Sequence, residues 1–327
     1  MRDFRKEGNC VKIERTELIA GDGRRLPGRI FLPDGEKTCV VQITHGMTEH
    51  IGRYADLALA LTDAGAVAAG FDLRGHGENA PGNDIASFGE GGWEASLTDM
   101  KLFSDFLKER YPSLPRYMLG FSLGSFLLRE YLGVYDDGLS GAVIMGTGHQ
   151  PNFVLAVMKA IIKGQISKNG FDNTTALIES LSFGAYNRAF RPNRTESDWL
   201  IADEKALQEY LTDPLCKKSI SSGLFYDLVS AMKRTGAKDA YDGWNKKLPV
   251  LLLSGQEDPV GSGGKGVKAV YSAMKKAGFE NVGMRLIPGA RHIVLSEKAS
   301  GAKDECIKAV CDFVGGKQKD VFRNDFR

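Results

Sequence analysis

The sequence predicts an α/β fold in which a mostly parallel sheet of eight strands carries helices on both faces. The main observation is that strand patterns and helical patterns alternate along most of the chain, which is typical of such sheets. The alternation stops between about residues 150 and 245, where only helical patterns occur. A length of 327 residues with 43% hydrophobic content allows one large core, so one domain with an insertion is favoured over two independent domains.

The first two predicted strands differ from the later ones. Segments 11–19 and 26–32 alternate apolar and polar residues, as antiparallel strands at the edge of a sheet do. The later strands are short apolar runs, which indicates that they are covered on both faces. They span residues 38–44, 66–71, 116–121, 141–146, 249–255 and 282–287.

Helical patterns follow most of these strands, at residues 54–65, 93–111, 125–135, 266–278 and 297–316. Four more lie in the part without strands, at 153–164, 174–183, 204–211 and 223–234. We therefore expect a core made of residues 1–149 and 246–327. Residues 150–245 are expected to form a helical cap, or lid, inserted after the sixth strand and lying over the edge where the parallel strands end.

The strongest local signal is Gly120-Phe121-Ser122-Leu123-Gly124, a G-x-S-x-G pattern between a predicted strand and a predicted helix. In this context the pattern indicates a nucleophile elbow, a tight turn that exposes the serine hydroxyl. A side chain at position 120 or 124 would collide with the neighbouring strand or helix, and the serine backbone must be strained. The five-residue pattern also occurs by chance, so the flanking strand and helix carry the prediction that Ser122 is a nucleophile.

A serine nucleophile needs a histidine base, and in folds with this elbow the chain order is serine, acid, histidine. Of the five histidines, only His149 and His292 follow Ser122. His292 comes just after the last predicted strand, where a loop would bring it to the carboxyl edge of the sheet. His149 comes too early for an acid to precede it on a strand of its own, and we expect it to be a loop residue. We therefore predict that His292 is the base.

The acid is expected in the loop after strand 249–255, which contains Glu257 and Asp258. We favour Asp258, which precedes a proline, and keep the adjacent Glu257 as the alternative. A second Asp-Pro pair, at Asp213, follows a helical pattern. Nothing in the sequence aims Asp213 at the carboxyl edge of the sheet, so it is not expected to be the acid.

A tetrahedral intermediate also needs two N–H donors for its oxyanion. One is expected from Leu123, the residue after the nucleophile. The other is expected from Met47, in the loop after strand 38–44, because Gly46 allows the backbone there to approach a substrate closely. We expect His45 and His76 to fix loops by hydrogen bonding rather than to act as bases.

Taken together, these motifs resemble the monoacylglycerol lipase and lysophospholipase branch of the α/β-hydrolases, the serine aminopeptidase S33-like or Hydrolase_4 family, in its bacterial type. The resemblance runs from about residue 24 to residue 314 and rests on HGMTEH (45–50), RY (53–54), FDLRGHGEN (71–79), GFSLG (120–124), GQEDPVG (255–261) and RH (291–292). It implies the α/β-hydrolase fold, a triad of Ser122, Asp258 and His292, and an oxyanion hole of Met47 and Leu123. One difference is that the animal enzyme has HGAGEH where this chain has HGMTEH.

The helical segment 153–164 is apolar on more than one face. One interpretation is a cap helix packed on its neighbours. The other is a helix that faces lipid or an acyl chain, with its lysines at the level of the headgroups. We expect the following cap residues to bind substrate: Ile161, Ile162, Phe183 and Tyr186.

Composition excludes several classes of function. With 43 basic and 41 acidic residues the formal charge is +2, so a nucleic-acid partner is not indicated. The five cysteines are odd in number and lack the spacing of metal ligands. We therefore expect no metal, free thiols and a cytoplasmic location, with transient contact between the cap and a membrane surface. No secretory signal is expected in the charged N-terminal residues 1–10, and no run is long enough to span a membrane.

The expected activity is hydrolysis of a small lipid ester, a monoacylglycerol or a lysophospholipid, through an acyl-enzyme intermediate and without any cofactor. The motifs alone indicate acyl transfer, and the resemblance selects the lipid class. Three alternatives stay open. An S33-type peptidase would use acidic cap residues such as Glu179, Asp198 or Glu204 to bind an amino terminus; an acyltransferase would use the same triad; a non-catalytic protein would only bind. No sequence feature indicates an oligomeric state.

Overall fold

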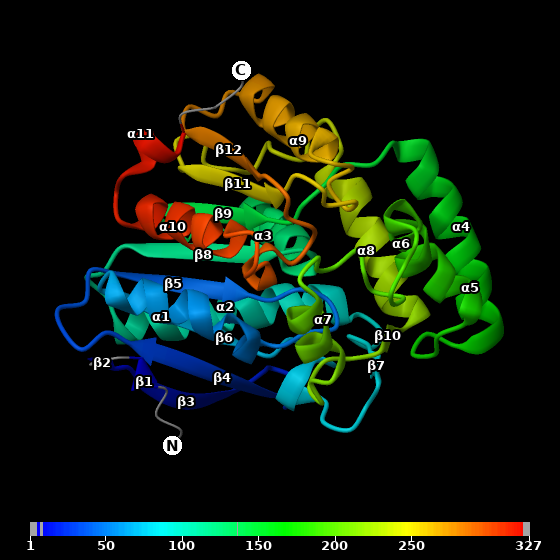
Figure 1. Cartoon of the computed structure of the whole chain (residues 1–327), viewed down its shortest axis with the longest axis horizontal. Coiled ribbons are helices and arrows are strands. Elements are labelled where there is room, and N and C mark those ends of the chain that lie inside the picture. Colours follow the sequence, from blue (N-terminus) through cyan, green and yellow to red (C-terminus); the bar gives the residue numbers. More distant parts are fainter. Residues whose placement is uncertain (1–4, 7–8, 136, 323–327) are drawn as a thin grey trace.

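The chain folds around one central sheet, shown in a computed structural model (Figure 1). The structure describes residues 5–6, 9–135 and 137–322. The rest of the expected core, residues 1–4, 7–8, 136 and 323–327, lies outside the described residues, as does most of the N-terminal segment in which no secretory signal is expected. None of the described helices is long and apolar enough to cross a membrane.

The sheet has eight strands in the order β12-β11-β9-β8-β5-β6-β4-β3. The β3–β4 and β4–β6 pairs are antiparallel, and the other neighbouring pairs are parallel. The predicted mostly parallel eight-stranded sheet is therefore confirmed. Its strands are β3 (Lys12–Ile19), β4 (Arg25–Leu32), β5 (Cys39–Thr44), β6 (Ala66–Phe71), β8 (Arg116–Phe121), β9 (Gly141–Met145), β11 (Val250–Gly255) and β12 (Val282–Ile287).

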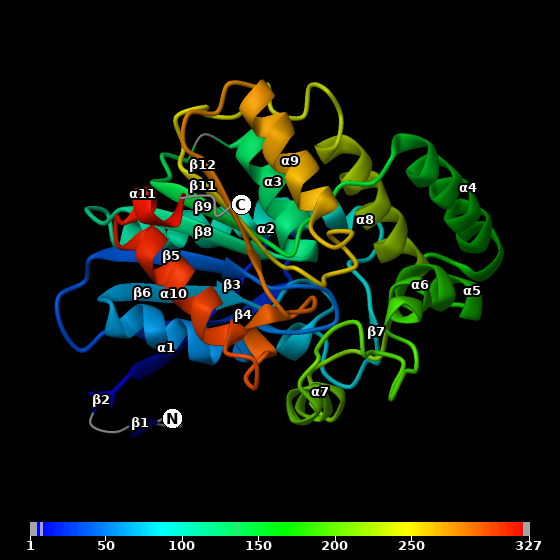
Figure 2. The ribbon, with the colours of Figure 1, turned by 45° about the horizontal axis from the view of Figure 1, so that its top comes forward.

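Each parallel strand alternates its side chains between two hydrophobic cores, one on each face of the sheet. On β5, for example, Val40 belongs to one core and Val41 to the other. Helices α2 (Gly92–Arg110), α3 (Leu123–Val134) and α9 (Lys265–Lys276) close the first core, whereas α1 (Ala55–Asp63) and α10 (Ala302–Val314) close the second (Figure 2). Because both faces are covered, the central strands read as continuous apolar runs in the sequence.

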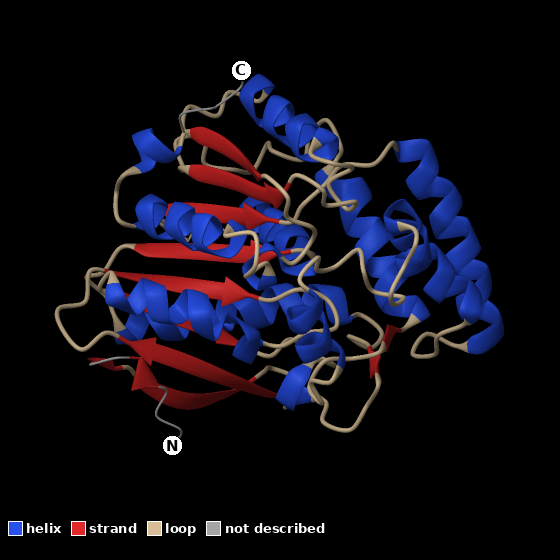
Figure 3. Ribbon diagram, in the orientation of Figure 1, coloured by secondary structure: helices blue, strands red, loops and turns tan. Residues whose placement is uncertain are grey.

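The inserted segment, residues 150–245, lies at the ends of the parallel strands, where the arrows of Figure 3 point. Helix α8 packs on α3 of the core, and α4 packs on the outer side of α8. The helix expected over 174–183 is interrupted, because α5 is followed by a π-helical turn at residues 180–184. The helices of the segment are α4 (Asn152–Asn169), α5 (Ala176–Glu179), α6 (Ala185–Asn187), α7 (Glu204–Leu211) and α8 (Ser222–Thr235).

The expectation that the inserted segment contains no strand is wrong at one point. Strand β10 (Ser219–Ile220) pairs in parallel with β7 (Ile85–Ala86), in the long connection after β6. A two-residue strand is too short to show any periodicity, so it could not be predicted from the sequence. The other short elements are β1 (Arg5–Lys6), β2 (Asn9–Cys10), α11 (Gln318–Val321), and one-turn helices at Ile51–Tyr54, Gly77–Asn79, Arg188–Phe190 and Val294–Ser296.

Strand order decides which loops can meet. Strands β5, β8, β9, β11 and β12 are consecutive neighbours and all run in one direction. The loops that follow β5, β8, β11 and β12 therefore emerge at one edge of the sheet, beneath the inserted segment. These four loops carry Met47, Ser122, Asp258 and His292.

Candidate active site

Ser122 occupies a strained turn between β8 and α3. Its backbone angles are φ 51° and ψ −115°, in a region that residues other than glycine rarely adopt. The two flanking glycines make the turn possible. A Cβ atom at Gly120 would lie 2.3 Å from the Gly124 carbonyl oxygen, and one at Gly124 would lie 2.3 Å from the Thr44 carbonyl oxygen. A side chain at position 120 or 124 would therefore collide with the neighbouring backbone, as predicted.

The structure brings Ser122, His292 and Asp258 into one hydrogen-bonded row. His292 Nε2 lies 2.8 Å from Ser122 Oγ, and His292 Nδ1 lies 2.9 Å from Asp258 Oδ2. A carboxylate only accepts hydrogen bonds, so Nδ1 carries the hydrogen and Nε2 is free to accept the serine proton. The ring is therefore in the tautomer that a general base requires.

Asp258 is held rigidly in a fully buried position. Its carboxylate accepts further hydrogen bonds from Ser254 Oγ at 3.1 Å and from the Val260 amide at 2.8 Å. The neighbouring Glu257 is exposed and makes no contact with His292 among the described residues. The loop after β11 thus presents Asp258, rather than Glu257, to the histidine.

The inserted segment packs directly on the histidine loop. The His292 ring lies 5.2 Å from the Trp199 ring and 4.9 Å from the Phe121 ring, measured between centroids. The Ile293 amide donates to the Leu200 carbonyl at 2.8 Å. The sequence analysis did not select Trp199; its only signal is a single large aromatic residue after the polar run 191–198.

Of the predicted oxyanion donors, Met47 lies in the loop after β5, and Leu123 is the first residue of α3, directly after the serine. Within the described residues neither amide has a hydrogen-bond acceptor. His45 fixes the Met47 loop, because its Nδ1 donates to the Gly46 carbonyl at 2.7 Å while its Nε2 accepts from the Leu73 amide at 2.9 Å. Burial lowers the pKa of His45 to about 3, so the ring is neutral and cannot serve as a titrating base near neutral pH.

His76 has the loop-fixing role that the sequence predicts. Its Nδ1 lies 2.7 Å from the Arg74 carbonyl oxygen, to which it donates. Burial, together with the neighbouring His45, lowers the pKa of His76 to about 3. Like His45, it is a neutral ring that holds a turn.

A cavity of about 590 Å³ opens over Ser122 and His292. Its wall next to the histidine is apolar and aromatic, and its rim is polar, which is the usual construction of a small-molecule site. The apolar lining includes Met47, Phe121, Phe183, Trp199, Leu200, Leu211 and Ile293, and the polar lining includes Thr48, Asp84, Thr195, Glu196, Ser197, Asp213, Lys217 and Lys218.

The four predicted substrate-binding residues separate into two groups. Phe183 lines the cavity, whereas Tyr186 does not line it and instead packs on Trp199, which does, with 5.1 Å between ring centroids. Ile161 and Ile162 line no part of it, which corrects their predicted placement. The reason is that α4 packs on the outer side of α8 and contributes no residue to the cavity lining. Ile162 is buried in the core with residues of α8, and Ile161 faces outward and is 37% exposed.

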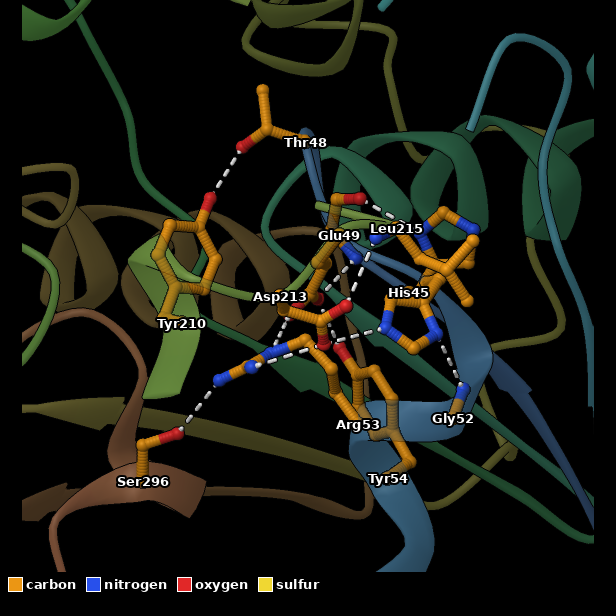
Figure 4. A network of polar contacts seen from close by, with 12 residues as sticks. His45, Thr48, Glu49, Gly52, Arg53, Tyr54, Tyr210, Asp213, Leu215 and Ser296 are labelled. Carbon is orange, nitrogen blue, oxygen red and sulfur yellow. Dashed lines mark hydrogen bonds and ion pairs between the residues drawn. The ribbon is translucent and has the colours of Figure 1, made fainter. Parts of the chain in front are cut away.

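Asp213 lies closer to the site than the sequence suggested. It lines the cavity, and its Oδ2 accepts from His50 Nε2 at 2.9 Å and faces Arg53 Nη1 at 3.8 Å (Figure 4). Burial raises the pKa of Asp213, but the hydrogen bonds from His50 and the Leu215 amide and the charge of Arg53 outweigh it and lower the pKa to about 2. Asp213 is therefore an ionised anchor in the loop after α7.

His50, Asp213 and Cys216 could in principle hold a metal ion, since their ligand atoms lie within 4.8 Å of one another. The surroundings oppose it. His50 Nδ1 accepts a hydrogen bond from the Gly52 amide at 3.2 Å, so Nε2 carries the hydrogen and is not a free ligand. Arg53 already supplies positive charge to Asp213. The group is better described as an ion-pair network than as a metal site.

A match to a known protein family shows to which family the chain belongs. The Hydrolase_4 family, described as serine aminopeptidase S33, matches residues 35–299. The chain belongs to this family. It is therefore an α/β-hydrolase, and the predicted serine ester hydrolase of the lipase and esterase type is confirmed for this Hydrolase_4 member.

Relatives of this Hydrolase_4 member include lipases and an esterase. Monoglyceride lipase of Mus musculus is 23% identical over 290 residues, which cover 88% of this chain and 86% of the relative. Monoacylglycerol lipase of Mycolicibacterium smegmatis is 25% identical over 293 residues, covering 84% and 88%. A solved thermostable carboxyl esterase from Bacillus coagulans superposes with a TM-score of 0.82 at 24% identity, covering 94% of this chain and 99% of that one.

The close contact at Gly124 gives a stability prediction. We expect Gly124→Ala to lower the free energy of unfolding by about 2–3 kcal/mol or more, because the added Cβ meets backbone oxygens that cannot move easily. Gly164→Ala, on the exposed side of α4 with open space around it, should raise it by about 0.5–1 kcal/mol. Urea unfolding curves of the two variants test this, and a Gly124→Ala protein as stable as the wild type would contradict it.

Proposed function

We propose that the protein hydrolyses small lipid esters, monoacylglycerols or lysophospholipids, with Ser122 as nucleophile. The observation that carries the proposal is the row of Ser122, His292 and Asp258, joined by hydrogen bonds of 2.8 and 2.9 Å and open to a cavity. A strained serine beside a correctly oriented histidine has a use in nucleophilic catalysis and none in simple binding. This weighs against a non-catalytic binding protein.

In the first half of the reaction, Ser122 Oγ attacks the ester carbonyl while His292 Nε2 takes the hydroxyl proton. Asp258 stabilises the imidazolium through Nδ1. The carbonyl oxygen becomes an oxyanion, which the amides of Met47 and Leu123 bind. His292 then gives its proton to the leaving alcohol, and the acyl group remains on Ser122 as an ester.

In the second half, a water molecule replaces the alcohol. His292 Nε2 takes a proton from this water as it attacks the acyl-enzyme carbonyl, and the same two amides bind the second oxyanion. Collapse of this intermediate returns the proton to Ser122 Oγ and releases the fatty acid. The complete reaction consumes one ester and one water molecule, and it regenerates Ser122 and His292 in their starting protonation states.

The substrate class is proposed from two sources. The relatives named above as monoglyceride and monoacylglycerol lipases support a monoacylglycerol. The cavity supports it physically, because aromatic and aliphatic residues can bury an acyl chain while the polar rim contacts a glycerol or headgroup. In this proposal residues 150–245 act as a cap that contributes Phe183 and Trp199 to the acyl-facing wall.

The family description raises aminopeptidase activity as an alternative, which would require an acidic group to bind an amino terminus. Glu179, Asp198 and Glu204 are not among the residues that line the cavity. The Asp198 carboxylate is already engaged by the Arg194 and Thr195 amides. The three acidic residues considered from the sequence therefore do not face a substrate in the cavity, whereas other acidic residues, among them Asp84 and Glu196, line it.

A cytoplasmic location is part of the proposal. Its support is that the cysteines whose side chains are described are free thiols, namely Cys39, Cys216, Cys306 and Cys311. Free thiols are typical of proteins in a reducing compartment.

We further propose that α4 makes transient contact with a membrane surface. Phe153, Val157 and Ile161 are spaced four residues apart and so share one face of α4, and they are 73%, 58% and 37% exposed. The exposed Lys163 and Lys168 lie on the same helix. An exposed apolar stripe with nearby lysines suits the boundary between acyl chains and anionic headgroups.

Ser122→Ala tests the nucleophile. We expect turnover of p-nitrophenyl butyrate and of a monoacylglycerol to fall by about 10⁶-fold, because the triad acts as a unit. Covalent labelling by a fluorophosphonate, read by intact mass, should disappear while the unfolding curve stays that of a folded protein. Labelling that persists at another serine would overturn the assignment.

Asp258→Asn and Glu257→Gln are a matched pair, since both remove one carboxylate charge from the same loop. Asn at position 258 would present an amide to His292 and favour the wrong tautomer, so kcat should fall by about 10⁴-fold. Glu257→Gln should leave kcat within about twofold, since exposed charges contribute little. The acid is misassigned if the two variants have equal activity or if Glu257→Gln is the slower.

The combined variant Phe153→Glu, Val157→Glu tests the membrane contact. Its binding to vesicles of anionic phospholipid should fall by about 10-fold or more, because two apolar side chains that would insert into the membrane are replaced by charged ones. Its kcat/KM on a soluble short ester should not change, since neither residue lines the cavity. Val134→Glu, at a residue 66% exposed on α3, is the control and should bind like the wild type. Equal vesicle binding by all three proteins would refute the contact.

A further inference from the structure

The loop after β5 holds a threonine in a conformation that threonine disfavours. Thr48 has φ 64°, in the left-handed region, where a β-branched side chain is crowded and glycine is the usual residue. Such a conformation persists only where surrounding contacts fix it, and these conformations cluster at functional sites. Thr48 directly follows Met47, so the contacts that fix it also bear on the Met47 amide.

Three hydrogen bonds fix Thr48, and two of them come from the inserted segment. Its Oγ1 donates to the Met47 carbonyl at 2.6 Å and lies 2.7 Å from the Tyr210 hydroxyl. A hydroxyl has one hydrogen, so Tyr210 is the donor in the second contact. The Thr48 carbonyl accepts from the Lys217 amide at 2.8 Å. Figure 4 shows Tyr210 reaching Thr48 from α7.

Tyr210 is itself held on several sides. Its ring is buried, and the Arg53 guanidinium lies 4.8 Å from the ring centroid. Burial raises the pKa of Tyr210, which keeps the phenol protonated and able to donate. Asp213, three residues later, is tied to His50 at 2.9 Å. Residues 210–217 therefore contact the loop after β5 at several points, through Tyr210, Asp213 and Lys217.

Among the described residues, the backbone N–H and carbonyl groups of Gly46 and the carbonyl of Met47 all have hydrogen-bond partners, and only the Met47 N–H has none. The Gly46 amide donates to Glu49 Oε1 at 2.7 Å, and the Gly46 carbonyl accepts from His45 Nδ1 at 2.7 Å. The Met47 carbonyl accepts from Thr48 Oγ1. The Gly46 carbonyl and the Met47 N–H share one peptide plane, so these bonds set the direction of the N–H. The hydroxyl of Thr48 thus fixes one side of the Met47 residue and His45 the other.

We propose that the Tyr210–Thr48 hydrogen bond is a positioning contact by which the inserted segment keeps the Met47 amide directed at the oxyanion. The proposal rests on the function proposed above, because it takes Met47 as an oxyanion donor. Tyr210 acts through Thr48 and does not touch the reacting atoms. In this proposal the oxyanion hole is complete only while α7 lies against the loop after β5.

Tyr210→Phe is the direct test, since it removes one hydroxyl and keeps the ring. We expect kcat for p-nitrophenyl butyrate to fall about 10- to 100-fold with KM within about twofold, because a misdirected donor weakens only the transition state. Affinity for a trifluoromethyl ketone, which forms an oxyanion when Ser122 adds to its carbonyl, should fall by the same factor. Affinity for butyrate, which forms no such oxyanion, should not change.

Substitutions at Thr48 separate the hydroxyl from the strain. Thr48→Ser keeps Oγ1 and should keep at least about half of the wild-type kcat. Thr48→Gly relieves the strain but removes the hydroxyl with both of its hydrogen bonds, to Met47 and to Tyr210, so it should lose at least as much as Tyr210→Phe. The double variant Thr48→Gly, Tyr210→Phe should lose no more than Thr48→Gly alone, because both substitutions remove the bond between Thr48 and Tyr210. Tyr241→Phe removes another buried tyrosine hydroxyl, 3.4 Å from Arg129 and outside the cavity, and should leave kcat unchanged.

Several outcomes would overturn the inference while leaving the proposed function standing. They are a Tyr210→Phe kcat within twofold of the wild type, a rise in KM alone, or losses that add in the double variant. If Tyr210→Phe does not fold, Thr48→Gly and Thr48→Ser decide: a difference of about tenfold supports the inference and equal activity overturns it. Failure of the proposed function is a separate result, seen when Ser122→Ala keeps the wild-type activity.

Discussion

The site depends on one close approach, the packing of the turn after β8 against the end of β5. Position 124 has no room for a side chain, because a Cβ there would lie 2.3 Å from the Thr44 carbonyl oxygen. This contact puts the turn of Ser122 directly beside the loop of residues 45–48. The parallel order of β5, β8, β9, β11 and β12 then brings the loops of Asp258 and His292 to the same edge. The turn of Ser122 and the loop of Met47 are therefore neighbours because the two backbones are in close contact.

The inserted segment completes this edge as a structural part of the site. Leu200 accepts a hydrogen bond from the amide of Ile293, next to the histidine, and Lys217 donates one to Thr48, next to Met47. Trp199 adds a ring against His292. Residues 199–217 thus extend along the cavity from the loop of His292 to the loop of residues 45–48. Helix α4 lies outside this span, packed on α8, and its exposed stripe is free for a different role.

What could be predicted from the sequence follows from the range of each signal. The strands, the helices and the elbow are short-range patterns, and the order of Ser122, Asp258 and His292 follows from the topology. The inserted segment lacks the alternation of strand and helix that fixes position in the core. Nothing local shows that Trp199 packs on His292, that Asp213 binds His50, or that Ile161 faces away from the cavity. These contacts exist only once distant segments have packed together.

Two strained residues, Ser122 and Thr48, line the cavity, and they are held in different ways. Ser122 is fixed by glycines packed inside the core, so its strain is maintained as long as the sheet and α3 are intact. Thr48 is fixed by its bond to Met47 and by two residues of the inserted segment. The turn of Ser122 therefore depends on the stability of the core, and the loop of residues 45–48 depends in addition on its contacts with the inserted segment. Sequence changes at Tyr210 or Lys217 thus act on the loop of residues 45–48 directly, whereas the contacts that hold the turn of Ser122 come from the core.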